Sequence, residues 1–343
     1  MRTSSLFSTI AGLSLLATAY ATPTFVSGVT ESSGWYDCNK LTNWRWEGGT
    51  TPTQFSYSSG NRITDNSMCW AHAASNILQW WQDKQPSDLI PNGTPNGLAS
   101  TATPYKGANN MTYYYDTYYV QHLAIFRDIA THWSNTAGSV ERAYNWYFNG
   151  GADAISGLDS IYGPSTAYMG TASDGGYYSN LGLTLGNDGV TSDLFTAYSF
   201  YHNDAKASVY SILQSYIDRD YGTTLSIGET GAGHAISMWG YEMDGEDMIV
   251  YLTDSDDLKH TLFKQKVLVD DYKNIYLTSL EGEADVYSNN YTYVTIDGVE
   301  YASLTGAQIG EVQGFIGAAL VPEPSSSILT LLGGLVLLGR RRR

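Results

Sequence analysis

The chain is poor in cysteine and in charged residues. Only 2 of its 343 residues are Cys, and Asp, Glu, Lys and Arg together make up 15%. Exported proteins stabilised by disulfides carry more cysteines, so the composition excludes a disulfide-dense scaffold. Acidic residues outnumber basic ones by 34 to 18, which gives a net charge of -16. We therefore expect no binding to nucleic acid or to an anionic membrane surface through general electrostatics.

Sequence motifs of several enzyme classes are also missing. The chain contains no phosphate-binding Gly-rich motif, no Gly-x-Ser-x-Gly turn and no His-Glu-x-x-His pair. Its histidines do not follow metal-ligand spacing, so we predict no metal site and no cofactor. By contrast, 43% of the residues are hydrophobic and 28 are Tyr. This composition predicts a sizeable core and a hydrogen-bonding surface suited to an extracellular protein.

Both ends of the chain have the composition of processing signals. Residues 1–21 hold a basic residue, an apolar run and an Ala-x-Ala cleavage site, which predict a secretory signal peptide. Residues 321–343 hold Pro-Glu-Pro, an apolar run too short for an ordinary span of about 20 residues, and a terminal Arg cluster. This tail resembles the PEP-CTERM sorting signal of Gram-negative bacteria; a simple membrane anchor is the alternative. We predict a secreted or cell-surface protein with one domain over residues 22–320 and transient membrane contact through the tail.

The stretch 68–81 predicts an amphipathic helix. Its apolar residues recur at the spacing of one helical face, and it follows Asp-Asn-Ser at 65–67, which are all good N-cap residues. Cys69 then lies in the first turn, where backbone N–H groups and the helix dipole favour an anion. A thiolate there is the reactive form of cysteine, so Cys69 is a candidate nucleophile. The alternatives are a small buried apolar residue and a disulfide with Cys38.

The periodicity of the chain changes after the middle. Further helical stretches are predicted over 113–133, 139–149 and 203–221, and a long surface loop over 86–111. From residue 223 onward the period is two, which predicts strands over 223–229, 234–243, 248–253, 261–269, 274–278, 291–296 and 313–320. Helices followed by an antiparallel sheet indicate an α+β fold.

Two of these strands bring polar residues together. His234 opens one strand, Asp-Gly-Glu-Asp at 244–247 predicts a hairpin turn, and the next strand ends just before Asp254 and Asp256. In this hairpin His234 lies opposite a position near 257, so one of the carboxylates can reach the imidazole. A carboxylate on one ring nitrogen leaves the other nitrogen as a base, which a cysteine nucleophile needs.

The same residues allow plainer interpretations. His234 can be a structural histidine at a strand start, and the two aspartates can belong to a solvated turn or a Ca²⁺-binding loop. The spaced Gly and terminal Glu of an EF-hand loop are missing, however. His72 lies on the same helical side as Cys69, but the spacing of the two residues does not by itself establish a hydrogen bond useful for catalysis. We interpret the remaining histidines as structural or exposed.

The order of the candidates resembles that of papain-like cysteine peptidases, with Cys at a helix start, His on a strand and Asp after the next strand. More closely, the chain resembles the IdeS/Mac family of immunoglobulin-degrading cysteine endopeptidases. The resemblance is carried by short patches of sequence that occur in the same order as in the family over residues 34–257, whereas the segments between them diverge from it. The residues that carry the resemblance are Gly34-Trp35-Tyr36-Asp37, Lys40, Cys69, Asn76, Trp80-Trp81, His234-Ala235, Trp239-Gly240, Asp244, and Tyr251 followed by Thr253-Asp254-Ser255-Asp256.

The resemblance implies roles for five residues and a papain-like fold, with Cys on the helical half and His and Asp on the sheet half. Cys69 matches the nucleophile, His234 the general base and acid, and Asp254 the carboxylate that orients the histidine. Asp256 matches a second supporting acid. Lys40 matches a lysine that helps to form the oxyanion hole beside the Cys69 backbone N–H.

Two departures from the family pattern stand near the nucleophile. Trp70 follows Cys69 where the family usually has Gly, which predicts a different cleft floor. The loop between Lys40 and Cys69 is longer than in the family. Cys38, close to Lys40, is expected to point toward the same cleft, which would allow a reversible Cys38–Cys69 bridge.

The sequence thus predicts a secreted cysteine endopeptidase that hydrolyses peptide bonds of extracellular proteins. The resemblance suggests immunoglobulin as substrate, and another host glycoprotein fits equally well. A non-catalytic Tyr-rich adhesin and an acyl transferase with the same three catalytic groups are the alternatives.

Overall fold

The computed structural model describes residues 22–40, 67–99, 105–106, 112–113, 122–133, 138–150, 175–183, 194–200, 204–228, 233–256, 260–280, 291–296 and 299–317. Its helices are α1 (Cys69–Asp83), α2 (Ala124–His132), α3 (Val140–Asn149) and α5 (Lys206–Asp218), with short 3-10 turns at η1 (Ser87–Leu89) and η3 (Ser179–Leu181). Its strands are β1 (Thr24–Phe25), β2 (Tyr105–Lys106), β3 (Thr112–Tyr113), β4 (Phe195–Ser199), β5 (Gly222–Ile227), β6 (His234–Asp244), β7 (Asp247–Thr253), β8 (Phe263–Val269), β9 (Ile275–Thr278), β10 (Tyr291–Ile296) and β11 (Val299–Phe315). The predicted signal peptide and sorting tail lie outside the described residues.

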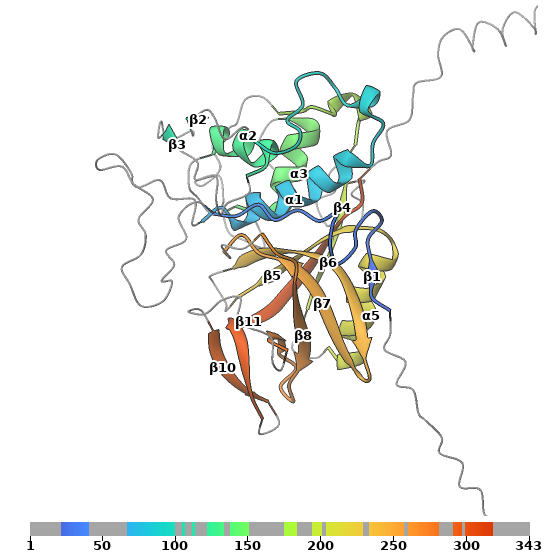
Figure 1. The fold of residues 1–343 in the computed structure, drawn as a ribbon, viewed down its shortest axis with the longest axis vertical. Coiled ribbons are helices and arrows are strands. Elements are labelled where there is room, and N and C mark those ends of the chain that lie inside the picture. Colours follow the sequence, from blue (N-terminus) through green and yellow to red (C-terminus); the bar gives the residue numbers. More distant parts are fainter. Residues whose placement is uncertain are drawn as a thin grey trace, which may run out of the picture.

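A closed antiparallel barrel forms the sheet half of the molecule (Figure 1). The strand order is β6-β5-β11-β9-β8-β7, and β7 pairs again with β6, which closes the ring. Strand β1 adds to β6, and β4 and β10 pair with β11. Because every strand of the ring is paired on both sides, β6 and β7 cannot slide past each other without breaking the barrel.

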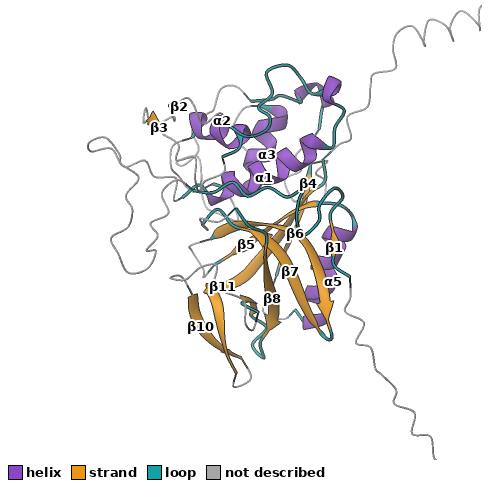
Figure 2. Cartoon of the chain, viewed as in Figure 1, coloured by secondary structure: helices purple, strands orange, loops and turns teal. Residues whose placement is uncertain are grey.

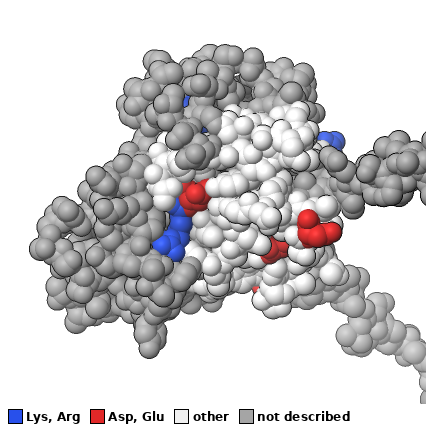
Figure 3. Space-filling model, turned by 90° about the horizontal axis from the view of Figure 1, so that it is seen from above, with Lys and Arg blue, Asp and Glu red and all other residues white. Residues whose placement is uncertain are grey.

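The helices α1, α2 and α3 lie together above one end of the barrel, and α5 lies on its flank (Figure 2). Helix α1 packs directly on β5 and β6. Gly222 of β5 makes this contact close, because a Cβ at that position would lie 2.3 Å from Cγ2 of Ile77 on α1. The helical end carries few charged side chains among the described residues (Figure 3), in keeping with the low charge content of the chain.

Helix α1 is buried on every side and not on one face only. All its residues from Cys69 to Gln82 are buried, because α2 and α3 cover the side that faces away from the barrel. The predicted helix is confirmed, but the second face that an amphipathic pattern leaves to solvent is covered as well. Of the helices that the structure describes, none has the length and hydrophobicity that spanning a membrane requires.

The α+β class is confirmed, and most predicted elements are present within a few residues. The predicted strand at 313–320 is one exception, because β11 runs from Val299 to Phe315. Gly306, Gly310 and Gly314 interrupt the alternation of apolar and polar residues in this segment, which hid the strand. Strands β2, β3 and β4 were missed. The predicted helix over 113–133 is helical only from Ala124 in the described residues, and its first residue, Tyr113, belongs to β3.

Candidate active site

Cys69 is the first residue of α1 and lies where the helical layer meets the barrel, against the start of β6. Its thiol is free and its side chain is 8% exposed. The sulfur lies 4.0 Å from the carbonyl oxygen of Gly233, and the backbone N–H of Ala235 donates to it. The N-cap residue is Met68, whose side chain makes no capping bond, so Ser67 is not the N-cap, and Asp65 and Asn66 lie outside the described residues. None of the first-turn residues of α1 is acidic, so no side chain of that turn opposes an anionic sulfur.

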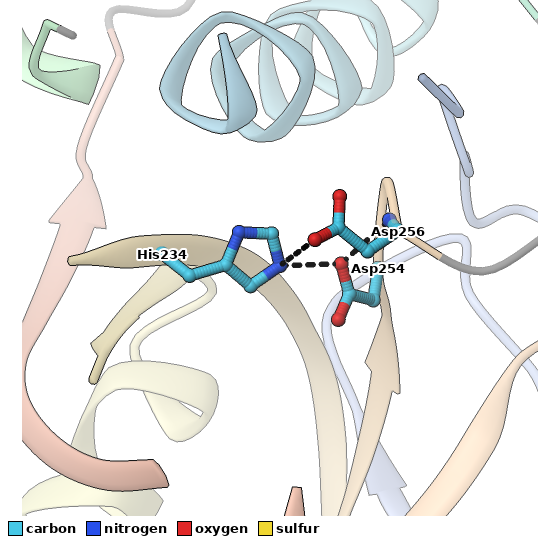
Figure 4. Close-up of side chains that lie close together, drawn as sticks. All are labelled: His234, Asp254 and Asp256. Carbon is cyan, nitrogen blue, oxygen red and sulfur yellow. Dashed lines mark hydrogen bonds and ion pairs between the residues drawn. The ribbon is translucent and has the colours of Figure 1, made fainter. Parts of the chain in front are cut away.

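His234 and Asp254 meet at the open end of the β6–β7 hairpin. The Nε2 atom of His234 lies 2.6 Å from Oδ1 of Asp254, and 3.9 Å from Oδ2 of Asp256 (Figure 4). The other ring nitrogen of His234 points toward α1 (Figure 4). Asp254 is 1% exposed, so its carboxylate acts on the ring with little screening by water. The two nitrogens of one imidazole therefore face the two groups that a Cys–His–Asp arrangement requires.

The register of the hairpin agrees with the prediction that His234 lies opposite a position near 257. Asp244 pairs with Asp247 at the turn, as predicted, and a bulge between Met238 and Gly240 shifts the pairing beyond it by one residue. Ser237 pairs with Thr253, so the register runs on toward Asp256. The extra residue is Trp239, which no pattern in the sequence marks as a bulge.

Lys40 reaches the site from the segment before the helical layer. Its backbone N–H donates to the carbonyl of Ser255 (2.7 Å), and its Nζ lies 2.5 Å from Oδ1 of Asp256. The side chain is 4% exposed. The structure therefore brings Lys40 together with Cys69, His234, Asp254 and Asp256, and the ammonium group contacts Asp256 directly.

The electrostatics of the site favour a thiolate and an imidazolium. Burial raises the pKa of the Cys69 thiol, but the hydrogen bond and charge of His234 and the charge of Lys40 outweigh burial and hold that pKa below its usual value. Burial lowers the pKa of His234, yet the charges of Asp254 and Asp256 and the bonds to Asp254 and Cys69 raise it well above its usual value. The two opposite shifts both favour transfer of the proton from the sulfur to the ring.

The two remaining charges complete this balance. Burial raises the pKa of Asp254. The charge of His234 and its hydrogen bond lower that pKa by more, so it lies below its usual value. Burial lowers the pKa of Lys40, but the charges of Asp256 and Cys69 leave it raised. Each charge in the site is therefore stabilised by an opposite charge, which is the condition for keeping them buried.

A divalent cation fits this cluster poorly. His234, Asp254 and Asp256 offer ligand atoms within 4.8 Å of one another. However, the ammonium of Lys40 already contacts Asp256, and Nε2 of His234 is engaged by Asp254. A cation would have to displace one positive group and compete with the other, so the Ca²⁺ alternative does not suit these residues.

The segment from Tyr36 to Lys40 supports the loop that carries the carboxylates. Asn39 Nδ2 donates to the carbonyl of Asp254 (3.5 Å) and to Oδ1 of Asp37 (3.2 Å), and the N–H of Thr261 donates to Oδ2 of Asp37 (3.2 Å). Asp37 is fully buried. Its carboxylate binds Thr261 after the carboxylate loop directly, and is connected to Asp254 before it through Asn39. Asp37 belongs to the patches that carry the resemblance, but no local pattern indicates its supporting role or that of Asn39, because their partners are distant in the chain.

A second support runs through the bulge. The indole N–H of Trp239 donates to Oγ1 of Thr253 (2.9 Å), whose hydroxyl donates to the carbonyl of Tyr36 (2.8 Å). Because Thr253 immediately precedes Asp254, this relay fixes the end of β7 against the segment that bears Lys40.

Cys38 does not point into the cleft, contrary to our expectation. It is fully buried, and its sulfur lies 3.2 Å from Nδ1 of His72, whose ring stacks on Phe126 of α2 with centroids 3.7 Å apart. Neither cysteine is part of a disulfide, so the structure contains no Cys38–Cys69 bridge. His72 likewise pairs with Cys38 and packs in the core, which fits its structural interpretation.

No protein-family model matches the chain, and no curated protein matches it. The case for a function therefore depends on the arrangement of Cys69, His234, Asp254, Asp256 and Lys40.

Proposed function

We propose that this protein is a cysteine endopeptidase that works through Cys69, His234 and Asp254. The observation that supports it best is the placement of one imidazole between a buried carboxylate, 2.6 Å from Nε2, and a thiol at a helix start. The opposite pKa shifts of Cys69 and His234 agree with this placement. A thiolate–imidazolium pair of this kind supplies the nucleophile and the acid of acyl transfer together.

In the first half of the reaction the Cys69 thiolate attacks the peptide carbonyl carbon, and the carbonyl oxygen takes the negative charge. The backbone N–H of Cys69 and the ammonium of Lys40 stabilise this oxyanion. The protonated ring of His234 then gives its proton to the leaving amine, and the C–N bond breaks. The products of this half are a free amine and a thioester on Cys69.

In the second half water hydrolyses the thioester. His234, now neutral, takes a proton from the water, which attacks the thioester carbonyl and releases a carboxylic acid and the thiolate. Asp254 holds the ring orientation and stabilises its charge in both halves. Asp256 holds Lys40 near the reacting atoms, which gives the second acid a role distinct from that of Asp254.

We also propose that the fold is papain-like and that the protein acts outside the cell. A helix that carries the thiol over an antiparallel barrel that carries the histidine supports the first part. The signal-like and sorting-like ends support the second. Membership of the IdeS/Mac family and cleavage of immunoglobulin are proposals that depend on the resemblance of the sequence patches.

The test is hydrolysis by the Cys69→Ala variant. We expect it to lose turnover completely while its melting temperature stays close to that of the wild type, because the change removes one sulfur atom. Cys38→Ala is the matched control, since it removes the other buried thiol without touching the reacting groups. Hydrolysis that persists in Cys69→Ala, or that is lost equally in both variants, would refute the proposal.

The substrates for this assay are an immunoglobulin and a panel of extracellular glycoproteins, with new amino termini as the readout. Products are analysed by mass, because water gives a free carboxylic acid whereas an amine acceptor gives an isopeptide. Isopeptide without hydrolysis would replace the peptidase by an acyl transferase on the same thiol.

A further inference from the structure

The site residues come from three separate parts of the chain, and one side chain joins all three parts. Asn76 lies on α1 and is 1% exposed. Its Oδ1 accepts a hydrogen bond from the backbone N–H of Cys38 (2.9 Å), and its Nδ2 donates to Oγ of Ser237 on β6 (3.2 Å). The backbone donor at Cys38 fixes which way the amide faces, because only the oxygen can accept.

Each of these attachment points lies close in sequence to a reacting or charged group. Asn76 follows Cys69 by two helical turns, so both lie on nearly the same face of α1, about 10 Å apart along the helix axis. Ser237 follows His234 by three residues on one strand, about 10 Å. Cys38 precedes Lys40 by two residues. Helix and strand are stiff over such lengths, so fixing these points fixes the groups beside them.

We propose that Asn76 is a positioning residue that sets the separation of the Cys69 sulfur from the His234 ring. It does so by fastening α1 to β6 and to the segment 36–40 through one amide group. The proposal rests on the proposed function, in which this sulfur and this ring react as a pair. Without the amide, α1 is free to shift on the barrel by the few tenths of an ångström that weaken the thiolate–imidazolium contact.

Gln79 is a natural control, because it is a second buried amide one turn further along α1. Its Nε2 donates to Oδ1 of Asn96 (2.7 Å) and to Oδ1 of Asp83 on α1 itself (2.7 Å), and its Oε1 accepts from the N–H of Gly97 (2.8 Å). The bonds to Asn96 and Gly97 fasten α1 to a loop that carries none of the site residues. Loss of Gln79 therefore removes the same kind of bonds from the same helix and leaves the bonds of Asn76 to Cys38 and Ser237 in place.

The experiment measures the rate of iodoacetamide modification of Cys69 against pH, with the modified residue identified by peptide mapping, in the full chain. We expect Asn76→Ala to raise the apparent pKa of the Cys69 thiol by about one unit or more, because a displaced imidazolium stabilises the thiolate less. One pKa unit corresponds to a tenfold change in the ratio of thiolate to thiol at a given pH. We expect kcat to fall tenfold or more with KM nearly unchanged. Gln79→Ala should lose similar thermal stability and keep the wild-type profile and kcat.

Ser237→Ala removes only one of the two bonds of Asn76 and should shift the profile in the same direction by less. It also serves if Asn76→Ala does not fold. Equal profiles in the Asn76→Ala and Gln79→Ala variants, or an unshifted profile in Ser237→Ala where Asn76→Ala does not fold, would overturn the proposal. The proposed function fails by different results. These are a Cys69 alkylation rate in the wild type that depends on pH as that of an ordinary thiol does, or hydrolysis by Cys69→Ala.

Discussion

Glu141 is expected to make the stability of the fold depend on pH. It lies in the first turn of α3, is 1% exposed, and shares its surroundings with Glu311 of β11. Burial and the charge of Glu311 raise its pKa from 4.5 to about 7, against smaller opposing effects of its own N–H, Ser139 and Arg142. The folded state therefore holds this proton more tightly than the unfolded chain does.

The sign follows from the raised pKa. Protonation of Glu141 stabilises the fold fully below pH 4.5, and this contribution is lost as the pH rises through about 7. The shift corresponds to about 3 kcal/mol of the free energy of unfolding, at 1.36 kcal/mol per unit. Glu141→Gln replaces the carboxyl by a neutral group of the same shape. The variant should match the wild type near pH 4.5 and exceed it by up to about 3 kcal/mol at pH 8.

The assay is urea unfolding of both proteins at several pH values, with the difference in free energy plotted against pH. Glu246→Gln, at the exposed β6–β7 turn, is the matched control that removes a carboxylate from the surface. A difference for Glu141→Gln that does not change with pH, or a variant less stable than the wild type at pH 8, would refute the assigned pKa and its cause.

Three further predictions concern the site and the contact between the two halves. Asp254→Asn should shift the pH profile of Cys69 alkylation to higher pH and lower kcat, because the imidazolium of His234 loses its carboxylate; an unchanged profile would contradict the assigned role. Chelation with EDTA should leave hydrolysis unaffected, and a loss restored by a divalent cation would indicate a metal at the carboxylate cluster. Gly222→Ala should destabilise the fold by about 1–3 kcal/mol, because its Cβ would overlap Ile77 of α1, and an unchanged melting temperature would show that the two layers separate easily.

The local part of the site could be predicted from the sequence. A helix start at Cys69 and a hairpin between His234 and Asp254 follow from periodicity and turn chemistry, which act over a few residues. The hairpin also predicts the meeting of His234 with a carboxylate, because its turn fixes which strand ends lie side by side. These are the parts in which neighbours in space are near neighbours in sequence.

The parts that could not be predicted depend on contacts between distant segments. The bulge at Trp239 is set by the fit of an indole to Thr253, and the bonds of Asn76 connect α1 to residues far along the chain. The burial of α1 on all sides depends on α2 and α3, which periodicity alone does not place over it. The long strand β11 is stabilised by pairing with β5, β9, β10 and β4, which compensates for glycines that weaken its own pattern.

The bulge in β6 has a consequence for how the gene can vary in length. Side chains along a strand alternate between its two faces, so deleting one codon between His234 and Met238 would turn the imidazole to the opposite face of the sheet. An insertion at the exposed tip around Gly245 would leave both strand ends in place. Functional relatives should therefore differ in length at the tip, and keep constant the number of residues that separates the histidine from the tryptophan.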